Sequence, residues 1–225
     1  MKFLLAFLLM IAAPCLHAQY SHADWIKILP DANASLEAKA DKLSYGFYFQ
    51  DRNIGLKVCL VLETSIKSEV PKPENSDQLR FLNPRIKIYA RSLKGVTANF
   101  ELPCTEEEFY DMLRPIAKHE VFELNSKQSP FEPLPMVLDG YTIVCVRNIG
   151  LQKKTIERKV SLSIPVRLLV EVLWKGVIKK METLPKSGLQ RFVSLLPGGE
   201  GQVIEDEQLL HKELESWLND PQNPI

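Results

Sequence analysis

The longest alternation of apolar and polar residues lies at 160–174, VSLSIPVRLLVEVLW, where every even-numbered residue is apolar. Successive side chains of a β-strand point to opposite faces, so a period of two predicts a strand with one face in a core. At ~3.3 Å per residue the stretch would extend about 50 Å, which is long for one strand. We therefore expect a bend at Pro165. Leu169 and Leu173 on the odd face predict a second cover there, from a helix or another subunit.

Shorter runs predict the remaining strands. They occupy residues 45–49, 56–66, 136–147, 177–184 and 190–196. In the run 56–66, Leu56, Val58 and Leu60 share one face and mostly apolar residues share the other, which indicates a central strand covered on both sides. The polar run 152–159 is expected to be a solvated connection.

The clearest predicted hairpin turns at residues 93–95, with a glycine where a three-residue loop needs a left-handed conformation. The resulting register places Ile88 opposite Phe100 and Lys87 opposite Glu101, and both pairs are compatible. One face of this hairpin should be buried and the other solvated.

Two helices are predicted. Thr105 and Glu108 have the spacing of a capping box, and apolar residues at helical spacing follow. Pro115 should end or kink this helix near Leu113. Residues 205–218 carry the apolar stripe of an amphipathic helix.

The N-terminus is typical of a signal peptide. Lys2 precedes the apolar residues 3–13, which are too few to span a membrane. We expect cleavage after Ala18; a lipidated Cys15 is the alternative, which Pro14 disfavours. The mature chain should be periplasmic, in the cell envelope or secreted, without a transmembrane span.

These patterns divide the chain into a signal peptide at 1–18, a lead-in or linker at 19–43, one β-rich domain at 44–220 and a tail at 221–225. A short helix at 35–43 is expected within the lead-in. Seven or eight strands in antiparallel hairpins, a mid-chain helix and a C-terminal amphipathic helix make the fold mainly β (α+β). An antiparallel β-sandwich, with the Ig-like arrangement as one form, is the natural packing of such a set.

Three cysteines remain after export, an odd number in an oxidising compartment. Cys59 and Cys145 both lie in predicted strands. They are either buried core thiols or the two ends of a disulfide. The disulfide would leave Cys104 free or available for a bond between chains.

The charge of the chain disfavours two classes of partner. Lysine plus arginine and aspartate plus glutamate number 28 each, and losing Lys2 with the leader leaves 27 against 28, a net charge of about −1. Nucleic-acid binding and polybasic attraction to a membrane both need an excess of basic residues.

No catalytic, cofactor or metal site is predicted. Cys104 precedes a helix, whose N-terminus would lower the pKa of a thiol, but the glutamates that follow oppose the thiolate. His22, His119 and His211 lack the spacing of metal ligands. The glycine-rich loop 197–201 lacks the lysine and hydroxyl of a phosphate-binding loop.

Two surfaces are candidates for interactions. The first is the outer face of the hairpin, formed by Arg85, Lys87, Tyr89 and Arg91. A cationic strand face with an aromatic ring could bind an acidic partner or glycan; alternatively, it is a solvated face that discourages aggregation. The second surface is formed by Leu169 and Leu173.

The leader and the β-rich pattern favour an exported, non-catalytic module that binds a partner or builds an assembly of the cell envelope or a surface appendage. Its partner would be a protein, a glycan or further copies of the chain, and no cofactor is expected. The alternatives are a hydrolase that uses scattered carboxylates on a β-scaffold, and a carrier of a small apolar ligand between sheets.

Overall fold

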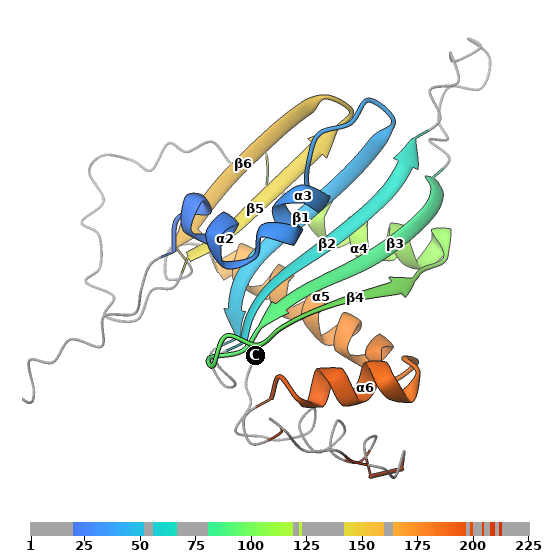
Figure 1. Ribbon diagram of the computed structural model, residues 1–225. Coiled ribbons are helices and arrows are strands. Elements are labelled where there is room, and N and C mark those ends of the chain that lie inside the picture. Colours follow the sequence, from blue (N-terminus) through green and yellow to red (C-terminus); the bar gives the residue numbers. More distant parts are fainter. Residues whose placement is uncertain are drawn as a thin grey trace, which may run out of the picture.

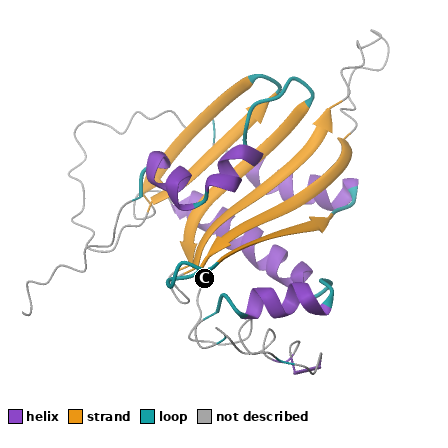
Figure 2. Cartoon of the chain, in the orientation of Figure 1, coloured by secondary structure: helices purple, strands orange, loops and turns teal. Residues whose placement is uncertain are grey.

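The computed structural model describes residues 20–51, 56–66, 81–118, 122, 142–159, 164–196, 199, 204, 208–209 and 212. Within them, six strands form one antiparallel sheet with helices on both faces (Figures 1 and 2). The strands are β1 (Lys42–Asp51), β2 (Leu56–Ile66), β3 (Phe81–Arg91), β4 (Thr97–Pro103), β5 (Thr142–Ile149) and β6 (Gln152–Lys159). Their order across the sheet is β4-β3-β2-β1-β5-β6.

The first face of the sheet packs against α4 (Glu106–Lys118), α5 (Ile164–Met181) and α6 (Lys186–Val193). Aromatic rings connect the two layers: the centroids of Phe49 and Trp174 are 5.5 Å apart, and those of Phe100 and Phe192 are 5.9 Å apart. The main core of the described residues therefore lies on this face.

The second face packs against α2 (His22–Ile28) and α3 (Pro30–Ser35), which cross in front of the sheet in Figure 1. Ser21 caps α2, since its Oγ accepts a hydrogen bond from the Asp24 amide at 3.3 Å. Trp25 is fully buried on this face. Residues 20–36, which the sequence pattern places in a lead-in or linker, are thus packed on the sheet. The short helix expected at 35–43 is wrong, because α3 ends at Ser35 and β1 begins at Lys42.

The strand predicted at 160–174 is wrong, because α5 occupies its described part, from Ile164 onward. The buried residues of α5 recur at steps of one and three, which is one face of a helix. They are Leu169, Val170, Leu173, Trp174, Val177, Ile178 and Met181. Val172, apolar and even-numbered, is 59% exposed. Pro165 lies in the first turn of the helix, where its missing amide costs no hydrogen bond.

Three more element predictions are wrong. Residues 177–181 continue α5 and residues 190–193 belong to α6, so neither run forms the expected strand. The polar run 152–159 is a strand, β6, rather than a connection. β6 is an edge strand that pairs only with β5, and most of its side chains are exposed to solvent, so they can be polar.

Several expectations are confirmed. The run 56–66 is β2, buried on both faces along most of its length. The β3–β4 register pairs Ile88 with Phe100 and Lys87 with Glu101, and Gly95 has φ of +88°. The capping box is also present: the Thr105 amide donates to Glu108 Oε2 at 2.7 Å, and the Glu108 amide donates to Thr105 Oγ1 at 3.2 Å.

The helix after this capping box does not end near Leu113, because α4 continues through Pro115 to Lys118. The described residues contain five helices rather than the two expected, and residues 208, 209 and 212, inside the predicted C-terminal helix, are also helical. The mainly antiparallel, α+β character is confirmed. The sandwich is not confirmed, since all six described strands belong to one sheet. Residues 1–18 and 221–225 lie outside the described part.

Candidate functional site

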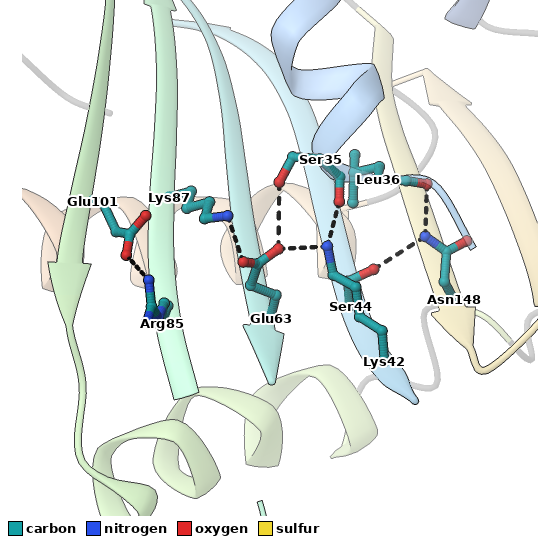
Figure 3. Close-up of polar contacts among 9 residues, drawn as sticks. All are labelled: Ser35, Leu36, Lys42, Ser44, Glu63, Arg85, Lys87, Glu101 and Asn148. Carbon is teal, nitrogen blue, oxygen red and sulfur yellow. Dashed lines mark hydrogen bonds and ion pairs between the residues drawn. The ribbon is translucent and has the colours of Figure 1, made fainter. Parts of the chain in front are cut away.

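A row of polar side chains crosses the second face of the sheet just beyond the end of α3 (Figure 3). Strand pairing sets this row: Ser44 on β1 pairs with Asn148 on β5 and with Glu63 on β2, and Glu63 pairs with Arg85 on β3. These four residues are the polar row. The part of this second face that lies under α2 and α3 is apolar.

Glu63 is the centre of the row and is only 9% exposed. Its Oε2 lies 2.6 Å from Lys42 Nζ, and its Oε1 lies 2.5 Å from Lys87 Nζ. Ser35 at the end of α3 donates its hydroxyl to Oε2 at 3.3 Å. Burial acts to raise the pKa of Glu63, but the hydrogen bonds and charges of Lys42 and Lys87 outweigh it and lower the pKa. Glu63 is therefore a carboxylate at neutral pH.

The pKa of Lys87 is raised, because the hydrogen bond and charge of Glu63 outweigh the opposing effect of burial. An ammonium group has three N–H donors, so Lys87 can donate further hydrogen bonds while it is paired with Glu63. Lys87 is thus a fixed cation with remaining capacity to donate hydrogen bonds.

The end of α3 is fixed to the row by main-chain contacts. Lys42 Nζ donates to the Ser35 carbonyl at 2.6 Å, and Asn148 Nδ2 donates to the Leu36 carbonyl at 2.8 Å and to Ser44 Oγ at 3.0 Å. These bonds satisfy carbonyls at the C-terminus of a short helix. The cations and the amide of the site are therefore held in place by the fold.

A polar pocket of about 330 Å³ lies at this end of the sheet. Its lining residues come from the segment just before β1, the first residue of β1, the end of β2 and residues 83–87 of β3. They are Lys39, Asp41, Lys42, Glu63, Thr64, Ser65, Asn83, Arg85 and Lys87. Four cations against two carboxylates give the lining a formal charge of +2.

One wall of the pocket is a β-bulge. Glu63 pairs with Arg85 but Ser65 pairs with Leu82, so three steps along β3 oppose two along β2. Asn83, inside the bulge, has φ of +54°, a left-handed conformation that asparagine tolerates better than most residues. Bulges redirect side chains and are common beside functional sites. The local irregularity of the sheet therefore coincides with the pocket.

The structure divides the candidate face of the hairpin in two. Arg85 and Lys87 line the pocket, and Arg85 also forms an ion pair with Glu101. Arg91 donates to the Ile28 carbonyl at 3.4 Å, and Tyr89 packs against the apolar cluster under the helices. Arg85 and Lys87 are thus available at the pocket, whereas Tyr89 and Arg91 help to hold α2 and α3.

The other predicted surface is not exposed. Leu169 is 1% exposed and Leu173 is 3% exposed, and both belong to the core on the first face. The sequence reasoning also missed the site residues Lys42, Glu63 and Asn83. A signal for Glu63 was present, since it is an acidic residue in an otherwise apolar strand run.

Cys59 and Cys145 are buried thiols, which confirms the first of the two alternatives, and the candidate disulfide between them is not formed. They pair with Tyr48 and Phe47, adjacent residues of β1, and therefore point to opposite faces. Their strands are separated by β1, about 10 Å in all, which exceeds the span of a disulfide. Burial raises the pKa of Cys59 well above its ordinary value. Burial also raises the pKa of Cys104, to about 11.

The described part of the chain holds no cluster of three or more His, Cys, Asp or Glu side chains suited to a metal ion. His22 is packed edge-on against Tyr48, and its pKa is lowered by burial and by Lys153. His119 and His211 lie outside the described residues. None of the helices in the described segments is long and apolar enough to cross a membrane.

A scan of the sequence against protein-family models finds no match. A search of curated proteins finds none with significant similarity.

Proposed function

We propose that the chain is an exported, non-catalytic binding module of the cell envelope, and that it docks an acidic partner in the pocket beside the polar row. The observation that carries this proposal is Glu63 held between Lys42 and Lys87 in a largely desolvated position. Each buried charge costs several kcal/mol of desolvation, and an apolar substitute is often no less stable. A charged cluster in a formed pocket therefore favours recognition as its role.

The charge of the cluster favours an acidic partner. Glu63 supplies one negative charge to two lysines, so the trio carries one uncompensated positive charge. Arg85 and Lys39 add cations to the same lining, and Asp41 adds a carboxylate. An incoming anion would complete the pairing of the lysines, which are already oriented by the fold.

The protonation states favour binding over catalysis. A general acid or base works best with a pKa near the operating pH. In this pocket the pKa of Glu63 is lowered and that of Lys87 is raised, so both shifts move away from neutrality. The two groups act as fixed charges.

Equilibrium binding of the mature chain to immobilised polyglutamate, polygalacturonate and neutral dextran tests this proposal. We expect salt-sensitive binding to at least one acidic polymer. Lys87→Met should weaken this binding, and so should Arg85→Met. The ion pair between Arg85 and Glu101 is about half exposed, so Arg85→Met should have little effect on the stability of the fold. Lys175→Met is the matched control, since Lys175 is an exposed residue of α5. If neither acidic polymer binds better than dextran, the proposed binding function is wrong.

Export is tested separately. We expect the mature N-terminus at Gln19 and the protein in the envelope or medium after cell fractionation. Recovery of the uncleaved chain in the cytoplasm would contradict this part of the proposal.

A further inference from the structure

The pocket offers hydrogen-bond acceptors as well as cations. Lys42 and Lys87 supply ammonium groups, while Asp41 and Glu63 supply carboxylate oxygens. The lining also contains the hydroxyl of Ser65 and the amide of Asn83, which can both donate and accept. A complementary ligand must therefore bring an anion and hydrogen-bond donors together.

This requirement excludes simple anions as good ligands. Inorganic phosphate or sulfate would approach the carboxylates of Asp41 and Glu63 at close range, and like charges repel. A fully ionised oxyanion also has few protons to donate to these oxygens. The lysines alone would bind such an ion, but the rest of the lining would oppose it.

Neutral and zwitterionic ligands also fit poorly. A neutral sugar brings hydroxyl donors but no charge for the lysines. An amino acid brings a carboxylate, but its ammonium group would enter a lining of four cations and two carboxylates. Both lack one half of the complementarity that the pocket offers.

We infer that the pocket binds a sugar acid, a hydroxylated ring that carries a carboxylate, as in a hexuronate unit of an acidic glycan. The carboxylate pairs with Lys42 and Lys87, and the ring hydroxyls bond to Asp41, Ser65 and Asn83. The volume of about 330 Å³ lies at the small end of ligand pockets, which suits one or two sugar units. This inference rests on the proposed function and specifies its ligand.

Isothermal titration of the folded mature chain tests the inference. The probes are digalacturonate, galactobiose, glutarate, free glutamate and inorganic phosphate. Digalacturonate should bind about tenfold more tightly than each of the other four, because only it supplies both the charge and the hydroxyl donors. Equal affinity for digalacturonate and glutarate would overturn the inference, since the hydroxyls would then contribute nothing.

Variants locate the effect. Lys87→Met should reduce the affinity for digalacturonate about tenfold, and Asn83→Gly should reduce it without straining the left-handed backbone. Lys175→Met should leave it unchanged. Unchanged affinity in both pocket variants would also overturn the inference. If polyglutamate binds at the pocket and digalacturonate does not, the sugar-acid ligand is wrong while the binding module stands; if no acidic probe binds, both are wrong.

Discussion

Glu63 and Lys87 form an ion pair of 2.5 Å across β2 and β3 although they are not directly opposite each other. In the register, Lys87 faces Val61 and Glu63 faces Arg85. Lys87 therefore reaches diagonally by two residues, a distance that a long side chain can span. The diagonal contact leaves Arg85 free to pair with Glu101 and brings two lysines to one carboxylate.

Removing the charge of Glu63 should destabilise the fold. Glu63→Gln leaves Lys42 and Lys87 without their shared counter-ion in a mostly desolvated position. We expect a loss of about 2 kcal/mol in the free energy of unfolding, measured by urea denaturation. Glu101→Gln is the control, because its ion pair with Arg85 is about half exposed and should contribute less than about 1 kcal/mol. Equal effects of the two substitutions would contradict the central position of Glu63.

The ion pair between Glu63 and Lys87 predicts that the free energy of unfolding depends on pH. The folded pKa of Glu63 lies below its unfolded value, so its contribution is complete at neutral pH and is lost as the pH falls through the folded pKa. The stability difference between wild type and Glu63→Gln should therefore shrink below about pH 5. Urea denaturation of both proteins between neutral and acidic pH checks this. A difference that stays constant over that range would show that Glu63 is not held ionised.

The close contact between Gly46 on β1 and Leu36 just after α3 leads to a prediction about how this helix packs on the sheet. A Cβ on Gly46 would overlap the methyl groups of Leu36, so Gly46→Ala must displace the Leu36 side chain. We expect a loss of about 1–3 kcal/mol and faster hydrogen exchange across α2 and α3. In the control Gly176→Ala, the new Cβ meets nothing within 4 Å on helix α5, and the change should be neutral or stabilising.

A double-mutant cycle makes this prediction sharper. Leu36→Ala removes the obstructing side chain, so Gly46→Ala should cost clearly less in that background than in the wild type. Additive costs would contradict a direct clash between the two residues.

The cysteines predict the pattern of thiol labelling. In the folded mature chain Cys104 should react with a thiol reagent, because its side chain is partly exposed. The reaction should be faster at alkaline pH, because the reactive form is the thiolate and burial raises the pKa of Cys104 to about 11. Cys59 and Cys145 should react only after unfolding, since both are buried. Mass analysis of labelled peptides under native and denaturing conditions checks this. A Cys59–Cys145 cross-link would contradict the strand order, because β1 lies between them.

The sequence predicted those parts of the fold in which local pattern and tertiary environment agree. In β2 and in the β3–β4 hairpin, alternation over a whole strand and a glycine turn specify both element and register. The strand prediction for 160–174 is wrong because a short series of aliphatic residues fits both the two-residue period of a strand and the 3.6-residue period of a helix. Extending the window to Val177, Ile178 and Met181 shows the helical spacing that a stop at Trp174 conceals.

The helix α2 was missed for a different reason. At seven residues it is too short for its apolar residues to repeat over several turns, and it depends on packing against the sheet. Ser21 and Asp24, which form a capping box in the structure, were the signal in the sequence.

The candidate site was predicted in part. Arg85 and Lys87 could be found because they lie on one strand, whose alternation is visible in the sequence. Lys42 and Glu63 could not be joined to them without the order of β1, β2 and β3. The left-handed Asn83 is a backbone feature of the bulge, and no pattern of side chains predicts it.

Chemical-shift mapping on the isotope-labelled mature chain tests the central claim most directly. Titration with digalacturonate and with a short polyglutamate should perturb the amides of Ser65, Asn83 and Lys87 in at least one series, and Lys87→Met should reduce those shifts. Perturbations confined to another surface, such as the edge strand β6, or no saturable perturbation with either probe, would contradict an acidic-ligand site between Lys42 and Lys87.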